Sequence, residues 1–480
     1  MNEQRRLAVP PGRIDPRRPV GMVRVRVIDE HTGRPVAAKL TFVGRHGSAT
    51  PRLSLADLPV RHGDALAAYN RVFAPTGVAD VPIPHGRYDL AVNHGPEWTE
   101  LIVSGVTVSE KAISIEAPLS HVADLPGWVS ADLHVHAAPS WDSVVPLEAR
   151  AAQFIADGVD VLVATDHNLA TDYGAAVHPA SAGHSLSAIS GSELTTDDWG
   201  HFGVFPLEPD PTWEVLAGRR VRGKTPERLI AQVRARAPEA LVSVNHPRLG
   251  KMGYFTLGSF DGSTAKSRRM GATEDFDAVE ILNGYQDANM RFVDVLLRDW
   301  FALLGHGRRV TAVGNSDTHH LHGQPGGYPR NYVQIGSESP SGPVLARALR
   351  AGRSFFTTGP MLELELRGGG IGDTVRAERG NVAGRVRVRA APWVDVSRVR
   401  IYLGGEVAAD WAVKAGAAAL RFERQFELAV ARDSFLVVRV DGKRPLGPSV
   451  APTRGAAMLP IAISNPVFVD GNGDGQWRPQ

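Results

Sequence analysis

The stretch PLEARAAQFIADGVDVLVATDHN, residues 146–168, contains the pattern that decides the expected fold. Its first part, 146–158, has apolar residues at helical spacing, and the apolar run 159–164 then leads into polar residues. Two later segments also predict helices, TPERLIAQVRARA (225–237) and SGPVLARALRAG (341–352). Strands that alternate with helices indicate βαβ units, and hence a parallel sheet or barrel covered on both faces.

Alternating apolar and polar residues dominate the chain on both sides of this middle segment. They predict half-buried strands at 22–29, 39–44, 86–93 and 101–108 before it, and at 362–366, 386–390, 398–404, 421–430 and 435–440 after it. We therefore expect five parts: a flexible arm (1–20), an N-terminal β-sandwich domain (21–123), an α/β domain (124–360), a C-terminal β-sandwich domain (361–466) and a tail (467–480).

The 480 residues include 17 His and no Cys, which limits the chemistry available to the chain. Without cysteine there is no disulfide framework, thiolate zinc finger, cysteine-held iron–sulfur cluster or cysteine nucleophile. A net charge of +2 gives no reason to expect nucleic-acid binding. The N-terminus lacks an apolar secretion signal and no apolar run is long enough to cross a bilayer, so we expect a cytoplasmic protein without a membrane partner. The oligomeric state is left open.

Polar residues in the middle segment fall where the expected strands end. In an α/β barrel the carboxyl ends of the strands form one face, where catalytic groups collect. The pattern therefore places six histidines and four carboxylates on one rim: His134, His136, His167, His201, His246, His319, Asp142, Asp166, Glu193 and Asp317.

Spacing within two of these groups favours metal binding. His134 and His136 are two apart on an extended segment, so both rings point to one side, and Asp317 and His319 repeat this geometry. Each element also has a structural interpretation: a lone strand-end His is more often a hydrogen-bonded core residue, and TDHN (165–168) could be a helix cap. Taken together, so many imidazoles and carboxylates would be costly to leave unpaired in one pocket, and a metal cluster removes that cost. Nitrogen and oxygen ligands fit Zn, Mn or Fe without choosing among them.

The motifs at these positions resemble a known family. They are ADLHVHAAPSWDS (131–143), VATDHN (163–168), GSELTT (191–196), VNHPR (244–248), EILNG (280–284) and GNSDTHH (314–320), and they are similar in order to the motifs of the PHP superfamily. The flanking segments 33–47, 85–100, 352–360 and 464–475 resemble the CehA/McbA group of PHP metallohydrolases, named for carbaryl hydrolases. The resemblance implies a distorted (β/α)7 barrel, flanked by the two β-sandwiches, with two or three divalent ions at its carboxyl-end face.

The same resemblance implies a set of ligands. His134, His136 and Asp317 would hold one ion, and Glu193 would bridge to a second ion completed by Asp142 and His167. The ligands of a third ion would be His201, His246 and His319, and Asp166 would orient a metal-bound imidazole. The amidohydrolase superfamily, which also opens with His-x-His, is a rival, but it usually adds a bridging lysine that no strand end here carries.

A cluster of this kind predicts a metal-dependent hydrolase. We expect metal-bound hydroxide near Glu193 to attack an ester, carbamate or amide bond of a small-molecule substrate. Glu193, Asp166 and His320 are the candidate catalytic residues, and His320 could supply a proton to the leaving group, although it could equally be an exposed loop histidine, as could His322. The residues that could orient substrate are Asn168, Asn245, Arg248, Asn283 and Tyr285.

Two other functions compete with this one. A phosphoesterase would need an arginine fork close to the metals, for which Arg248 and Arg330 are candidates. A non-catalytic binding protein that kept the fold should have lost ligands, whereas all nine positions are filled. At the C-terminus, Asp470, Asn472 and Asp474 match the start of a calcium loop, but the chain ends before its last glutamate, so a packed turn is the better interpretation.

Overall fold

The computed structural model describes residues 19–54, 57–177, 184–209 and 223–479, so the expected arm at 1–20 lies almost wholly outside the described residues. Strands make up 41% of the structure and helices 12%. No helix in the described ranges is long and apolar enough to span a membrane. The cytoplasmic location expected from the sequence stays a prediction.

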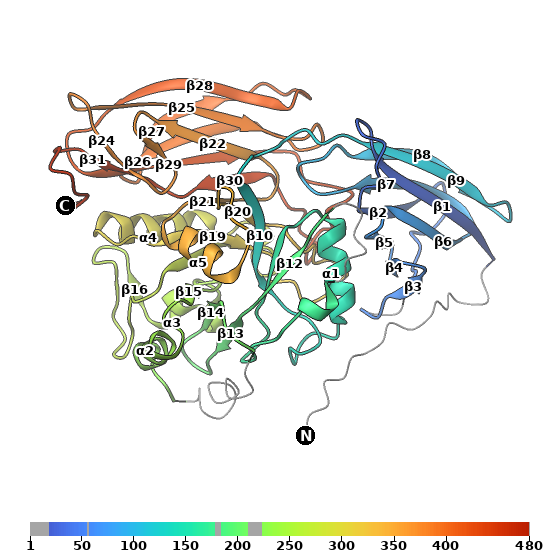
Figure 1. The fold of residues 1–480 in the computed structure, drawn as a ribbon, viewed down its shortest axis with the longest axis horizontal. Helices are drawn as coiled ribbons and strands as arrows, with labels where there is room; N and C mark the ends of the chain where they lie inside the picture. Colours follow the sequence, from blue (N-terminus) through green and yellow to red (C-terminus); the bar gives the residue numbers. More distant parts are fainter. Residues whose placement is uncertain (1–18, 55–56, 178–183, 210–222, 480) are drawn as a thin grey trace.

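Two sheets form the N-terminal part of the chain (Figure 1). One has the order β6 (Val78–Pro84), β1 (Val20–Asp29), β9 (Ile113–Leu119); the other has the order β3 (Val60–His62), β4 (Ala65–Ala68), β5 (Arg71–Ala74), β2 (Ala38–Arg45), β7 (Gly86–Asn93), β8 (Leu101–Val108). Alternate residues of both sheets, such as Val25 and Phe42, are buried in one shared core. The period-two runs thus produce the half-buried strands that they predict.

Two further sheets carry the middle of the chain. The larger begins with β12 (Ser187–Ser190), β11 (Val161–Ala164), β10 (Trp128–Val135), β20 (Arg330–Gln334) and β21 (Ser354–Thr357). The smaller has the order β13 (Ser192–Thr195), β14 (His201–Phe205), β15 (Leu241–Val244), β18 (Ala278–Asn283), β19 (Thr311–Asn315). Strand pairing between these two sheets is limited to isolated β-bridges, one between Val135 and Thr318 and one between His167 and Glu193.

The expected (β/α)7 barrel is wrong. The described residues form several sheets without a closed barrel and contain only five α-helices. β14 runs antiparallel to both β13 and β15, and β20 runs antiparallel to β10, so the sheets are mixed rather than parallel. Gly191 lies at the passage from one sheet to the other, between β12 and β13. The chain is packed closely there, since a Cβ on Gly191 would meet Val204 O at 2.8 Å. The sequence pattern identified strand ends but could not show in which direction each strand runs.

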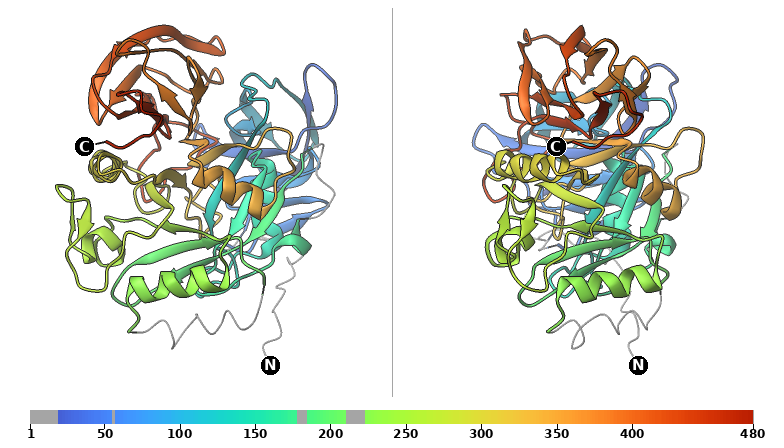
Figure 2. Two further views of the ribbon diagram at one scale, coloured as in Figure 1. Left: turned by 60° about the vertical axis from the view of Figure 1, so that its left-hand side comes forward. Right: turned by 90° about the vertical axis from the view of Figure 1, so that its left-hand side faces the viewer.

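The larger sheet continues into the C-terminal part of the chain. β21 pairs with β30 (Ile461–Ser464), and the order goes on through β29 (Ser434–Asp441), β26 (Arg398–Leu403) and β27 (Glu406–Ala412), with β31 (Val467–Asp470) and β24 (Thr374–Arg376) beside it. A separate four-stranded sheet lies above it, in the order β23 (Gly369–Gly370), β22 (Met361–Leu366), β25 (Asn381–Arg389), β28 (Leu420–Ala429) (Figure 2). One small hairpin joins β16 (Phe260–Asp261) to β17 (Lys266–Ser267). The domain boundaries expected from the sequence stay a prediction.

The helices cover the middle sheets. They are α1 (Leu147–Ala156), α2 (Pro226–Arg236), the short α3 (Tyr254–Leu257), α4 (Val293–Gly305) and α5 (Gly342–Arg350). α1 buries Phe154 and Ile155, and Asp157 at its end forms a fully buried ion pair with Lys39 of β2. This pair fixes the N-terminal sheets against the part of the chain that carries the candidate site.

Candidate metal centre

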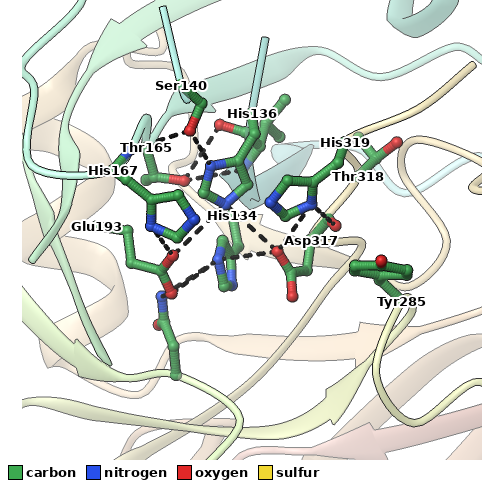
Figure 3. A network of polar contacts seen from close by, with 12 residues as sticks. His134, His136, Ser140, Thr165, His167, Glu193, Tyr285, Asp317, Thr318 and His319 are labelled. Carbon is green, nitrogen blue, oxygen red and sulfur yellow. Dashed lines mark hydrogen bonds and ion pairs between the residues drawn. The ribbon is translucent and has the colours of Figure 1, made fainter. Parts of the chain in front are cut away.

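Nine polar side chains meet where the two middle sheets face each other. Figure 3 labels His134, His136, His167, Glu193, Asp317 and His319 among them. They form four overlapping groups, and within each group the ligand atoms lie within 4.8 Å of one another. The groups are His136, Asp142, His167, His319; His134, His246, Asp317; His134, His136, Glu193; and His167, Glu193, His201. The structure therefore brings together all nine residues that the sequence analysis proposed as metal ligands.

Glu193 lies at the centre of this cluster and is 1% exposed. Its Oε1 lies 3.1 Å from Nε2 of His134 and 3.3 Å from Nδ1 of His201, and its Oε2 lies 2.9 Å from Nδ1 of His167. Asn245 donates to the same Oε1 at 2.9 Å. A carboxylate in contact with imidazoles from several strands has the geometry of a bridging ligand.

The backbone holds the two paired motifs opposite each other. The N–H of His136 donates to Thr318 O at 3.1 Å, and the N–H of Asp317 donates to His134 O at 2.9 Å. Asp317 and His246 have φ of 53° and 31°, left-handed values that side-chain-bearing residues rarely adopt. Strained backbone of this kind concentrates at functional sites, where the surrounding structure maintains it.

Residues outside the nine orient the imidazoles. Glu280 is fully buried, and its Oε1 lies 3.1 Å from Nδ1 of His134. Ser140 Oγ lies 3.1 Å from Nδ1 of His136, and Thr195 Oγ1 lies 2.6 Å from Nδ1 of His167. The sequence analysis did not assign these three residues. An acidic residue inside the apolar run 278–282 was the signal that could have identified Glu280.

Charges within the cluster shift its pKa values strongly. Burial alone would raise the pKa of the Glu193 carboxyl, but the neighbouring His134, His201 and His167 hold it well below its usual range. Burial opposes protonation of His167 as well, yet Glu193 and Asp142 raise its pKa to about 10. For His136, burial and the nearby His319 dominate and lower the pKa to about 3. The cluster thus combines anionic carboxylates with at least one imidazole that remains neutral.

Unpartnered nitrogens show that the cluster fits metal ions. Nε2 of His136 and Nδ1 of His201 are buried and accept or donate no hydrogen bond, although a carboxylate oxygen lies 3.3 Å from each. A buried polar atom without a partner costs about 1–3 kcal/mol. A divalent ion between each nitrogen and carboxylate would remove this cost, and the donor set of imidazoles and carboxylates suits such an ion.

Asp166 lies near the cluster but does not orient an imidazole, which corrects the role expected for it. Its carboxylate accepts hydrogen bonds from the N–H of Ala137 at 3.0 Å and from the hydroxyl of Tyr173 at 3.1 Å. Burial raises its pKa to about 6. Asp166 therefore fixes the loop after His136, and the carboxylate that orients a ring is that of Glu280.

The candidate substrate residues divide into two kinds. Asn245 and Asn283 reach the centre, because Asn245 donates to Glu193 and Asn283 donates to Asp317 Oδ2 at 3.0 Å. The ring of Tyr285 lies 5.3 Å from that of His319. By contrast, the side chain of Asn168 is bonded to the backbone of Thr195.

The two arginines proposed for a phosphate fork and the proposed proton donor have other partners. Nε and Nη2 of Arg248 donate to the two carboxylate oxygens of Asp299, at 2.7 Å each. Arg330 is buried and donates to three backbone carbonyls. Nδ1 of His320 lies 2.8 Å from Asp57 Oδ2, so this ring is held on the loop beside the cluster.

The C-terminal aspartates form a turn. Both oxygens of Asp470 accept backbone N–H groups, from Gly473 at 2.6 Å and Gly475 at 2.8 Å, and Asn472 accepts the N–H of Asp474. Nearby, Trp477 is buried and donates to Ser434 O. These contacts favour the packed turn over the calcium loop.

Comparison with family profiles and with curated proteins finds no match. Among solved structures, the chain is similar to the CARDB domain of a Pyrococcus furiosus protein. The solution structure shares 18% identity over 23% of this chain and 95% of that chain, with a TM-score of 0.16. The crystal structure in complex with di-metal ions shares 17% identity over 23% of this chain and 88% of that chain, with a TM-score of 0.15. At such TM-scores the likeness supports no conclusion about this chain.

Proposed function

We propose that the protein is a metal-dependent hydrolase that cleaves an ester, carbamate or amide bond in a small molecule. One observation carries the proposal: nine buried or half-buried imidazoles and carboxylates from distant parts of the chain converge around Glu193. The ordered motifs that resemble those of the PHP superfamily also support it, as do the flanking segments that resemble those of the CehA/McbA metallohydrolases. That likeness is one of motifs, since the barrel expected from it is not found.

The residues of the cluster would have different roles in such a reaction. Two or three divalent ions (Zn, Mn or Fe), when bound, would lower the pKa of a coordinated water toward ~7 and polarise the substrate oxygen. Glu193, which contacts several imidazoles at once, is among the residues that would hold these ions and so fix their position. Asn245, bonded to Glu193, would fix the orientation of its carboxylate. Glu280 would keep the ring of His134 in one tautomer.

The contacts of the two candidate arginines, Arg248 and Arg330, favour a carbonyl substrate over a phosphoester. A phosphoryl group is usually held by an arginine fork. Arg248 donates to Asp299 and to Phe255 O, and Arg330 donates to three backbone carbonyls. Neither guanidinium is available to a substrate at the cluster.

The test begins with metal analysis of the purified protein and continues with hydrolysis assays. Protein loaded with Zn, Mn or Fe should cleave aryl esters or aryl carbamates much faster than aryl phosphates. Glu193→Gln should abolish this activity, and Glu365→Gln, an exposed glutamate paired with Arg385, should leave it unchanged. Strong phosphatase activity without ester cleavage would refute the proposed bond. Less than one ion per chain would favour the non-catalytic binding protein instead.

A further inference from the structure

One of the four ligand groups faces solvent. Asp142 is its exposed member, and its Oδ2 lies 3.1 Å from Nε2 of His167 and 3.1 Å from Nε2 of His319. The members of the other three groups are all buried. A substrate would therefore reach the cluster at Asp142, between His167 and His319.

Two aromatic rings lie on either side of this opening. Trp141 stacks on His167 with ring centroids 4.2 Å apart and an interplanar angle of 15°, and it is 66% exposed. On the other side, the ring of Tyr285 lies near that of His319 (Figure 3), with ring centroids 5.3 Å apart. An exposed tryptophan that packs on a candidate ligand offers a planar apolar surface next to the reaction centre.

An arginine from the C-terminal part of the chain completes this opening. The guanidinium carbon of Arg454 lies 4.3 Å above the ring of Tyr285. Arg454 is exposed, and nowhere in the described ranges does a carboxylate lie close enough to pair with it. It is thus a cation that stacks on an aromatic ring and whose donors meet no carboxylate among the described residues.

The backbone presents Arg454 at the tip of a tight turn. Thr453 and Ala456 exchange backbone hydrogen bonds of 2.9 and 2.8 Å, and Arg454 and Gly455 between them have φ of 49° and 81°. Such two-residue turns favour asparagine or glycine at the position of Arg454, because a left-handed φ strains larger residues. A strained residue that projects toward a candidate site points to a function for its side chain.

We propose that Trp141, Tyr285 and Arg454 form a recognition site for substrates that carry both an aromatic ring and a carboxylate. This inference rests on the proposed hydrolase function and narrows its substrate class. The aromatic ring of the substrate packs between Trp141 and Tyr285, and its carboxylate, at the end of the ring away from the scissile bond, accepts hydrogen bonds from the planar guanidinium fork of Arg454. The scissile bond then lies over Asp142 and the ions.

A matched pair of esters tests the carboxylate requirement. 4-Acetoxybenzoate and its methyl ester share the same scissile acetyl bond and the same ring, and only the first carries a free carboxylate. The metal-loaded protein should cleave the anion with a kcat/KM about tenfold higher, as expected for one charge-assisted hydrogen-bond pair. Arg454→Gln should remove this preference and leave the cleavage of the methyl ester within about twofold. Arg424→Gln is the matched control. Arg424 of β28 also stacks on an aromatic ring, that of Trp411 in β27, and neither residue belongs to the candidate site.

Equilibrium binding separates this inference from the hydrolase proposal. Calorimetry with the cleavage product 4-hydroxybenzoate should show about tenfold weaker binding to Arg454→Gln than to the unchanged protein, whether or not either ester is cleaved. Cleavage of neither ester together with this loss of binding would refute the hydrolase and support the recognition site. Equal cleavage of both esters, unaffected by Arg454→Gln, would overturn the recognition site and leave the hydrolase standing. Tighter binding of 4-hydroxyphenylphosphonate than of 4-hydroxybenzoate would overturn the assignment to a carboxylate.

Discussion

At the scale of single residues, the carboxylate of Glu280 accepts four hydrogen bonds and yet belongs to none of the ligand groups. Its Oε1 accepts from His134 and Asn315, and its Oε2 accepts from the N–H of His246 and from Asn283. Two candidate ligands are thereby fixed by one buried side chain. Outer carboxylates of this kind set the tautomer and raise the basicity of metal-binding imidazoles.

We expect Glu280→Gln to lower the affinity for metal ions about 10–100-fold. The amide places two hydrogens where the carboxylate had accepting oxygens, so at least one of the present donors loses its partner. Competition with a chromogenic chelator measures the affinity directly. Glu365→Gln on the exposed face of β22 is the control, and an unchanged affinity in Glu280→Gln would show that its hydrogen bonds do not act on the metal ligands.

Asp287 offers a pH-dependent prediction outside the cluster. Its Oδ1 is buried without a partner, and burial raises its pKa to about 6 from a model-peptide value of 3.8. Because the folded protein holds this proton more tightly than the unfolded chain, the contribution of Asp287 to stability is fully present below pH ~4 and is lost as the pH rises through ~6.

Asp287→Asn should therefore stabilise the metal-free protein at pH 8 by roughly 1–2 kcal/mol, after allowance for solvent screening. Near pH 4 the variant and the unchanged protein should have the same stability. Urea unfolding at both pH values measures the difference. A difference of the same size at the two pH values would contradict the shifted pKa.

At the scale of elements, asparagine side chains connect β19 to the larger sheet. Asn465, which follows β30, donates to Ala312 O at 2.9 Å and accepts the N–H of Ala312 at 2.7 Å. Asn331 of β20 contacts Gly314 in the same way, at 2.9 and 3.0 Å. These amides satisfy backbone groups of β19 that no neighbouring strand pairs with. They therefore position the strand from which Asp317 and His319 extend.

Replacing Asn465 should destabilise the fold more than a surface asparagine does. In Asn465→Ala, the N–H and C=O of Ala312 remain buried without partners, at a cost of about 1–3 kcal/mol each. We expect a loss of roughly 2–4 kcal/mol in the free energy of unfolding, measured by urea titration. Asn472→Ala, in the exposed C-terminal turn, is the control and should cost less than about 1 kcal/mol.

The sequence predicted the candidate centre better than it predicted the fold around it. Polar residues at strand ends are visible in the sequence, and the pairs His134 with His136 and Asp317 with His319 lie where that pattern indicated. The direction of β14 is not visible, because an apolar run that begins at His201 reads the same in either orientation. The links made by Asn331 and Asn465 are tertiary contacts over 17 and 153 residues, which no local pattern reports.

At the scale of the whole molecule, the candidate centre joins segments from two sheets. Ligands lie on or after β10 and after β11 of one sheet, and on or after β13, β14, β15 and β19 of the other. Between these sheets the backbone contributes single bridges. Metal ions would therefore cross-link two parts of the molecule that few backbone hydrogen bonds connect.

Removal of metal should lower the melting temperature. Ions present at a hundredfold excess over their dissociation constant stabilise the folded state by about 2.7 kcal/mol, which corresponds to roughly 3 °C for a chain of 480 residues. Differential scanning calorimetry with and without a chelator measures the shift. In His136→Ala the chelator should have a smaller effect, and an equal shift in both proteins would place the stabilising ions elsewhere.

The larger sheet also governs the order in which the molecule can be completed during synthesis. β21 pairs with β20 along one edge, but the partner of its other edge is β30, and the amide that satisfies Ala312 belongs to Asn465, 153 residues later. A ribosome must therefore add residues to at least 465 before the strand bearing Asp317 has all its contacts. Until then, one edge of β21 stays unpaired and could associate with other chains, so the growing polypeptide should depend on chaperones late in its translation.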